Sequence, residues 1–442
     1  MNSATASRGT GPDHRSVPPA VRRKGRLGPG LVFFFSSMGP GTFLTSAVAG
    51  ATYGYSLIWA LALALLFRFV WVNVSASYVL VTRESLLQGY ARLGRWLVWT
   101  SLVVTILVRH SSNLYTILLM GNAAHLLLPL PVAHSGAIWS VGLTILGVVM
   151  MIGGGYALIE RLCTIVIVVL GISLPIAAVV AHPDPAAIAR GLFIPTMPNS
   201  TGVYSALLLL AAMIGAQAGS MSNLSYSYFA SERGWSGPED LRRQRLDLLA
   251  STACRFGIGT LLQVAAAATI LPLGLKPQSA EELVRIFSDS MGMLGRVIFG
   301  LGLWGICFSS FVGGTMGYSL IVRDICRRYV PGLRVAADSD TLTKSSRDDA
   351  VYQWSVALLG LSPLYVVFLA VEPVALTLLV RSMVVILIPV LVGALIKIAN
   401  DKALMGPHRP SVFSNAVLAL LVVVSVYLTV RDSGEWWRIL VG

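Results

Sequence analysis

Eleven long apolar stretches, nearly free of charged residues, constrain this chain more than any other feature of its sequence. An apolar stretch of about 18 residues or more can cross the hydrocarbon core of a bilayer as an α-helix. Only 12% of the 442 residues are charged, about half the share in soluble domains, so too few polar residues remain to cover a soluble surface. The sequence therefore predicts an all-α polytopic membrane protein. The predicted spans are 29–52, 55–80, 96–127, 134–153, 158–181, 202–230, 248–273, 292–322, 353–371, 374–397 and 412–430.

The same composition excludes several classes of protein. A soluble enzyme, a disordered protein and a nucleic-acid binder are all excluded, although the net charge is +13. No motif for ATP binding and no arrangement of nucleophile, base and acid is present, so we expect neither ATP-driven transport nor catalysis. The four cysteines show neither paired nor metal-ligand spacing, and we expect buried free thiols at Cys163, Cys254, Cys307 and Cys326.

Basic residues are distributed unevenly between the predicted loops, which predicts the orientation in the membrane. Residues 1–27 are polar, Pro-rich and basic, and we interpret them as a disordered cytoplasmic tail. Arginines also collect after the sixth and eighth spans, whereas loops 128–133 and 372–373 contain no Lys or Arg and loop 182–201 contains only Arg190. We expect the chain to cross the cell inner (plasma) membrane. With the N-terminus in the cytoplasm, eleven spans place the C-terminus on the outer side.

Two of the predicted spans are interrupted by residues that disfavour a continuous helix. The first contains Gly39-Pro40-Gly41, and the sixth contains small and polar residues from Gly215 to Asn223. Small residues also allow tight helix packing, so either run alone is compatible with a broken helix and with a continuous, closely packed one. Because these spans are the first helices of two five-helix units, their separation favours an inverted repeat with broken helices 1 and 6 around a central site. The expected units are 28–181 and 202–397, followed by an eleventh span at 412–430.

Short motifs follow one another in a fixed order along most of the chain, from about Gly28 to the last span. They include Leu27-Gly28-Pro29-Gly30, residues 49–59 (AGATYGYSLIW), residues 154–161 (GGYALIER), Pro183-Asp184-Pro185, Arg190-Gly191-Leu192, residues 308–315 (FSSFVGGT) and residues 400–406 (NDKALMG). In order and spacing they resemble the NRAMP (natural resistance-associated macrophage protein) family of divalent-metal transporters. The resemblance implies a divergent bacterial-type member with the leucine-transporter-type fold, two inverted five-helix repeats plus one helix.

The residues that bind metal in this family are not present here. Where the family has Asp-Pro-Gly-Asn, this chain has Gly39-Pro40-Gly41-Thr42, and Gly219, Ser220 and Met221 stand nearest to the family's Met-Pro-His. By the same resemblance, Asn113 replaces an aspartate associated with proton passage, and Arg381 replaces a glutamine near the ion. Hard dications need oxygen ligands, preferably anionic ones, so we predict no metal site.

Three arginines lie in the middle of predicted spans, where each costs roughly 2.5–3.5 kcal/mol on insertion scales. These are Arg68, Arg109 and Arg381, while the nearest carboxylates, those of Glu160, Asp247 and Glu372, lie towards helix ends. Arg68 fits either snorkelling or a bond to backbone carbonyls, and Arg109 fits a hydrogen-bonded network with the polar run His110 to Asn113. His110 fits either proton movement or a neutral, hydrogen-bonded core position.

The loss of acidic groups and the gain of Arg381 predict an anion as substrate. The predicted function is therefore secondary active transport of bicarbonate or a small carboxylate by alternating access. The alternative is a proton-coupled transporter of Mn²⁺, Fe²⁺ or Mg²⁺ with an atypical site, and a third hypothesis is a non-transporting sensor. We expect no cofactor, a proton or sodium ion as coupling partner, the lipid bilayer as surroundings, no nucleic acid and a functional monomer. The predicted substrate-binding residues are Gly39, Gly41, Thr42, Gly219, Ser220, Met221, Ser222, Asn223 and Arg381, and the predicted coupling or gating residues are Arg68, Arg109, His110 and Asn113.

Overall fold

The structure is a computed structural model. In the part of the chain that it describes, helices make up the regular structure. The described residues are 39–153, 182–219, 237–333 and 348–441, together with positions 165, 168, 169, 171–176, 178, 179, 223, 226 and 235. The predicted tail 1–27 and the predicted site residues Ser220, Met221 and Ser222 lie outside them.

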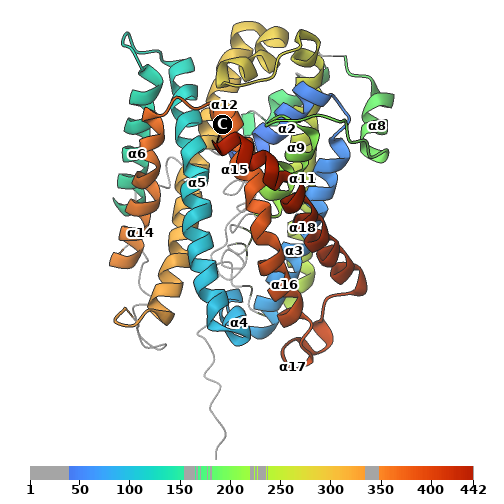
Figure 1. The fold of residues 1–442 in the computed structure, drawn as a ribbon, viewed down its shortest axis with the longest axis vertical. Coiled ribbons are helices and arrows are strands. Elements are labelled where there is room, and N and C mark those ends of the chain that lie inside the picture. Colours follow the sequence, from blue (N-terminus) through green and yellow to red (C-terminus); the bar gives the residue numbers. More distant parts are fainter. Residues whose placement is uncertain are drawn as a thin grey trace, which may run out of the picture.

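The helices stand side by side, with α4 and α17 at one end of the bundle and α8 near the other (Figure 1). In chain order the α-helices are α2 (Pro40–Tyr53), α3 (Ile58–Thr82), α4 (Leu86–Leu93), α5 (Arg95–Leu127), α6 (Ser135–Gly153), α8 (Pro185–Phe193), α9 (Ala206–Gln217), α11 (Leu241–Thr269), α12 (Ala280–Tyr329), α14 (Ala350–Leu361), α15 (Pro373–Met383), α16 (Ile388–Ala399), α17 (Lys402–Met405) and α18 (Val412–Val441). The 3₁₀ segments are η1 (Pro238–Asp240), η2 (Leu271–Leu273), η4 (Ser362–Phe368), η5 (Val384–Leu387) and η6 (Gly406–His408).

Eight helices in the described residues are long and apolar enough to cross a membrane, and they coincide with eight of the eleven predicted spans. The other three predicted spans, 29–52, 158–181 and 202–230, lie partly outside the described residues; α2 and the shorter apolar helix α9 are described parts of two of them. The prediction of a helical, multi-pass membrane protein is confirmed.

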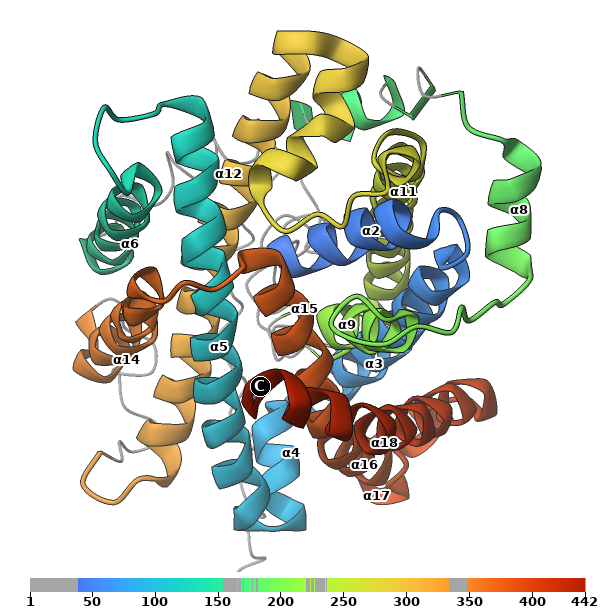
Figure 2. The same ribbon diagram turned by 45° about the horizontal axis from the view of Figure 1, so that its top comes forward.

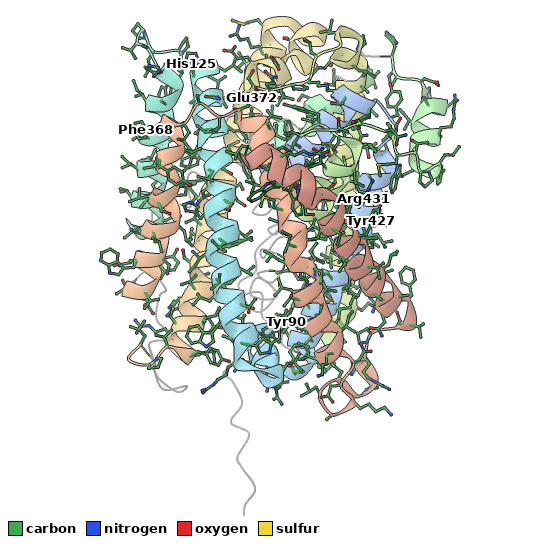
Figure 3. All side chains as sticks on the ribbon, in the orientation of Figure 1. Tyr90, His125, Phe368, Glu372, Tyr427 and Arg431 are labelled. Carbon is green, nitrogen blue, oxygen red and sulfur yellow. The ribbon has the colours of Figure 1, made fainter. Side chains whose placement is uncertain are left out.

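Large apolar side chains cover much of the outer surface, as expected of helices that face lipid tails. Phe368 and Val412 are 85% and 86% exposed, and Figure 3 shows Phe368 pointing away from the bundle. Tryptophans lie exposed towards both ends, Trp96 at the start of α5 and Trp437 near the end of α18, as in the aromatic belts of membrane proteins. The expectation of buried thiols is confirmed for Cys307 but is wrong for Cys254, which is exposed on this apolar surface, and Cys326 is half-buried; Cys163 lies outside the described residues.

The chain leaves helical geometry at both predicted breaks. Gly39 has extended backbone angles and Pro40 is the first residue of α2, a position where proline's missing N–H costs no helical hydrogen bond. At the second break α9 ends at Gln217, and Asn223 donates hydrogen bonds to the carbonyls of Gln217 and Ala218, at 3.1 and 3.0 Å. Helix α2 packs against α9, and α15 packs against both, so the two breaks and α15 meet inside the bundle (Figure 2).

A third interruption lies in the tenth span, which we expected to be continuous over 374–397. There α15 ends at Met383, a 3₁₀ turn covers Val384–Leu387, and α16 begins at Ile388. Pro389 explains the change, since its nitrogen cannot donate the α-helical hydrogen bond to the carbonyl four residues earlier. Arg381 and Ser382 therefore lie at the end of a helix segment rather than in its middle.

Candidate substrate site between α2, α9 and α15

Arg381 lies in the last turn of α15 and reaches the start of α2. Its side chain is 8% exposed, and the guanidinium lies so close to Gly41 that a Cβ at this position would collide with its Nε. A Cβ on Gly39 would lie 3.9 Å from Arg381 Nη2 and 2.8 Å from Ser310 Oγ of α12. The two glycines thus give a guanidinium access to the N-terminus of α2, the positive end of its dipole.

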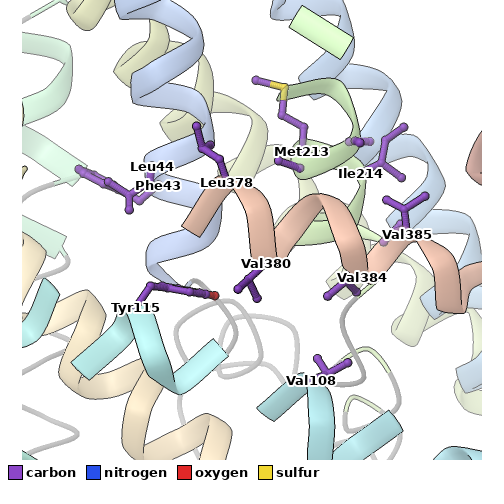
Figure 4. Packing of buried hydrophobic residues seen from close by; sticks show 14 of the residues in the cluster. Phe43, Leu44, Val108, Tyr115, Met213, Ile214, Leu378, Val380, Val384 and Val385 are labelled. Atoms are coloured by element: carbon purple, nitrogen blue, oxygen red, sulfur yellow. The ribbon is translucent and has the colours of Figure 1, made fainter. Parts of the chain in front are cut away.

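Tyr115 of α5 forms the opposite wall of this position. The guanidinium carbon of Arg381 lies 5.5 Å from the centroid of the Tyr115 ring. Figure 4 shows the ring extending from α5 towards α2 and Val380 of α15. Within the described residues, the hydroxyl of Tyr115 and the Nε of Arg381 are buried without a hydrogen-bond partner. Buried polar groups normally have hydrogen-bond partners, so both atoms keep an unused capacity to donate a hydrogen bond.

Arg109 is held on α5 by the hydrogen-bonded network that we considered for it. Its Nε donates to Asn113 Oδ1 at 3.0 Å, and Asn113 Nδ2 donates to the Leu359 carbonyl at 2.7 Å and Thr315 Oγ1 at 3.3 Å. A Cβ on Gly314 would collide with the guanidinium of Arg109, so that glycine makes room for it. The network fixes α5 to α12 and α14.

The site carries an excess of positive charge. Arg109 and Arg381 are close enough to repel each other electrostatically, and neither forms an ion pair within the described residues. No group of three or more His, Cys, Asp or Glu side chains in the described part of the chain is placed to hold a metal ion. Two buried guanidinium groups that form no ion pair in the described residues leave this part of the bundle positively charged.

Arg68 lies at the second break rather than beside Arg381. Its Nη1 donates to the carbonyl of Gln217 at 3.4 Å, where α9 ends, which agrees with the expected bond to backbone carbonyls. Arg255 of α11, which the sequence analysis did not single out, is as fully buried as Arg68, at 1% exposed, and repels it electrostatically. The side-chain amide of Gln217 has no hydrogen-bond partner in the described residues.

The remaining predicted residues divide into two groups. Thr42 is buried in the first turn of α2, and Gly219 packs against Gly215 and Val384, so both lie at the breaks. His110 contacts η4: its Nδ1 lies 2.9 Å from Ser362 Oγ and its Nε2 lies 3.3 Å from Tyr365 Oη. Its role in proton movement stays a prediction.

Sequence reasoning did not find Tyr115 and Ser310 at the site, nor the buried carboxylate of Asp432 on α18. Tyr115 and Ser310 lie in apolar helices, where they look like ordinary core positions. Asp432 on α18 is 1% exposed, and its Oδ2 has no hydrogen-bond partner among the described residues; it was missed because the eleventh span was predicted to end at 430. The sequence signal for Asp432 was its position, two residues beyond the apolar stretch 412–430.

Many apolar helices and two broken spans that face each other across a central site define a multi-pass transporter of the leucine-transporter type. The sequence profile of the family described as "Natural resistance-associated macrophage protein-like" matches residues 30–432. The chain belongs to this family, as the motifs between Gly28 and the last span predicted.

Curated relatives and solved structures agree with this assignment. The "Divalent metal cation transporter MntH" of Aeromonas hydrophila is 25% identical over 432 residues, which cover 94% of this chain and 98% of the relative. The crystal structure of the Eremococcus coleocola manganese transporter superposes with a TM-score of 0.75 at 17% identity, covering 92% of this chain and 86% of that one. The structure of MhsT with L-phenylalanine has a TM-score of 0.57 at 14% identity, covering 94% and 99%. At such identities the structures show the fold alone.

Proposed function

We propose that this member of the family is a secondary transporter that carries a small oxyanion, such as bicarbonate or a small carboxylate, by alternating access. The observation that carries the proposal is the position of Arg381. Its buried guanidinium lies at the N-terminus of α2, with Nε free of any acceptor in the described residues. A guanidinium binds planar oxyanions through two parallel hydrogen bonds, and the end of a helix dipole adds to the attraction.

Charge opposes a dication at the same place. A divalent ion about 5 Å from one guanidinium would be repelled by roughly 7 kcal/mol at an effective dielectric constant near 20. Arg109 adds to this repulsion, since it is electrostatically coupled to Arg381. An oxyanion gains from both arginines, and it offers acceptors to Arg381 Nε and to the hydroxyl of Tyr115.

A second candidate substrate is a divalent metal cation, and the relatives support it better than they support an anion. The relatives from Aeromonas hydrophila and Chromohalobacter salexigens, at 25% and 28% identity, are both named divalent metal cation transporters. For this chain the metal ligands would have to include residues outside the described part, such as Ser220 to Ser222, or backbone carbonyls and waters.

The two candidates are distinguished by binding and uptake with the purified full-length protein. We expect calorimetry to detect bicarbonate or acetate binding, and proteoliposomes to take up no more Mn²⁺ than empty vesicles do. Saturable Mn²⁺ uptake that Gly39→Trp abolishes would replace the anion proposal with the metal one. Absence of both activities would reject both substrates.

Arg381 variants test which side chain carries the anion. Arg381→Lys keeps the charge but loses the paired hydrogen bonds, so anion affinity should fall partially. Arg381→Gln should lower it about ten- to a hundredfold, because a hydrogen bond to a charged group contributes roughly 1.5–3 kcal/mol. Arg431→Gln, which removes an exposed arginine of α18, is the matched control and should bind normally. A folded Arg381→Gln protein with unchanged anion affinity would remove Arg381 from the site.

Tyr115→Phe removes a single hydroxyl that has no partner in the described residues, so folding should be unaffected. Anion affinity should fall up to about tenfold, the value of one ordinary hydrogen bond. Calorimetry checks the affinity, and Tyr78→Phe, in a buried tyrosine of α3 outside the site, should leave it unchanged. Equal affinities in the two variants would place the Tyr115 hydroxyl outside the anion site.

A further inference from the structure

A cavity of about 330 Å³ lies away from the central site, at the end of the bundle marked by α4 and α17. Its walls are α3 from Phe69 to Ser77, Arg245 in the first turns of α11, and residues 408–414, which lead from η6 into α18. Its volume is within the range, about 300–1,000 Å³, of sites that bind small ligands.

The rim of the cavity is basic. Arg245 and Arg409 line it together with His408, and no acidic residue is among the lining side chains that the structure describes. In the described residues neither arginine forms an ion pair; Arg409 donates only to the carbonyl of Gly406, at 3.3 Å. Two unpaired guanidinium groups that converge on one cavity provide the donors that a phosphate group requires.

The floor of the cavity holds a polar group that the protein leaves incomplete. Asn73 of α3 is 9% exposed, and its Oδ1 has no hydrogen-bond partner in the described residues. The neighbouring Ser77 does not satisfy it, since the Ser77 hydroxyl donates to the backbone carbonyl of Asn73, at 2.7 Å. A buried amide with an unpaired atom calls for a ligand that carries hydroxyl groups as well as charge.

Apolar side chains continue from the cavity onto the outer surface of the bundle. Phe69 and Phe413 line the cavity itself. Next to Arg245, α11 exposes Leu246 and Leu249 by 57% and 51%. At the start of α18, Val412 is 86% exposed. A soluble phosphate ion makes no use of such surfaces, whereas the acyl chains of a phospholipid do.

We propose that this cavity binds the head group of an anionic phospholipid. The phosphate lies between Arg245 and Arg409, a head-group hydroxyl reaches Asn73, and the acyl chains lie along the exposed faces of α11 and α18. A head group with a glycerol hydroxyl, as in phosphatidylglycerol, fits these contacts better than a choline does, because choline adds a further positive charge to a rim that already carries two arginines. This lipid site does not depend on which ion the central site binds.

Full-length protein in detergent tests the proposal through native mass spectrometry and thermal unfolding. The probes are phosphatidylglycerol and phosphatidylcholine with identical acyl chains, and glycerol 3-phosphate and inorganic phosphate as soluble sources of the same group. We expect phosphatidylglycerol alone to remain bound and to raise the unfolding midpoint. Arg245→Gln combined with Arg409→Gln should weaken its apparent affinity about thirtyfold, the equivalent of about 1 kcal/mol for each basic residue.

The matched control is Arg242→Gln combined with Lys402→Gln, which removes two exposed charges from the same end of the bundle without touching the cavity. It should retain the preference for phosphatidylglycerol. Equal binding of the two lipids, or an equal loss in both double variants, would overturn the proposal in favour of diffuse attraction. Equal stabilisation by glycerol 3-phosphate or inorganic phosphate would assign the cavity to a soluble ligand instead. If the cavity double variant does not fold, Arg409→Gln alone gives the same comparison.

Discussion

Single residues determine which side chains can meet at the start of α2. Arg381 needs room at the start of α2, and Gly39 and Gly41 provide it where the family motif has an aspartate and a glycine. Arg381 could be predicted as a site residue from the sequence because an arginine in a membrane span is energetically costly. No such signal marks Tyr115, whose aromatic ring in an apolar helix is indistinguishable from a core residue until α15 is packed against it.

At the end of α12, one carboxylate makes a prediction about pH possible. Asp349 accepts hydrogen bonds from Arg323 Nε at 2.8 Å and from Arg327 Nη2 at 2.8 Å, and it caps α14 through the Val351 N–H. Burial alone would raise the pKa of Asp349, but the hydrogen bonds from both arginines and from Val351 outweigh it and lower the pKa to about 2.

Because this folded-state pKa lies below the unfolded value, Asp349 stabilises the fold fully above about pH 4. That contribution should disappear as the pH falls from about 4 towards 2. We expect the difference in unfolding midpoint between the wild type and Asp349→Asn to be largest at pH 7 and to shrink at pH 3. A difference that stays constant over this interval would show that the ion pairs do not stabilise the protein.

The helices themselves were predictable to different degrees. Length and hydropathy identified the eight long helices, since a bilayer imposes a minimum length on each span. Gly39-Pro40-Gly41 marked the first break because proline lacks an N–H. The 3₁₀ turn at Val384–Leu387 was missed because its residues are all apolar; the signal was Pro389, two residues beyond the turn.

The contact between α9 and α15 gives a prediction at the scale of elements. A Cβ on Gly215 would collide with the backbone carbonyl of Arg381, and a backbone atom cannot move aside as a flexible side chain can. Gly215→Ala should therefore destabilise the protein by about 1–3 kcal/mol, as overpacking does, and lower the midpoint of thermal unfolding.

Gly393→Ala in α16 is the matched control, because a Cβ there meets nothing within 4 Å. It should be neutral or stabilise by up to about 1 kcal/mol, since alanine favours a helix over glycine. If both variants unfold at the same temperature, α9 and α15 do not pack as closely as the structure has them.

For the whole molecule, basic residues gather at one end of the bundle. The start of α5 and the end of α12 pack together there with α4, through Leu87, Val98, Ile321 and Ile325. The start of α11 joins the same end through the cavity that it shares with the start of α18. Arg95, Arg245, Arg327 and Lys402 all lie at this end, whereas Figure 3 shows Glu372 at the opposite one.

By the positive-inside rule, the end of the bundle with α4 and α17 should face the cytoplasm. A cysteine-free parent carrying either Lys402→Cys in α17 or Asn199→Cys in the loop before α9 tests this, because both positions are exposed and lie at opposite ends. A maleimide that cannot cross membranes should label Asn199→Cys in intact cells, and Lys402→Cys only after permeabilisation. The parent should stay unlabelled throughout. The reverse pattern would place the basic end outside the cell and the phospholipid cavity in the outer leaflet. The distribution of Lys and Arg in this protein would then not follow the positive-inside rule.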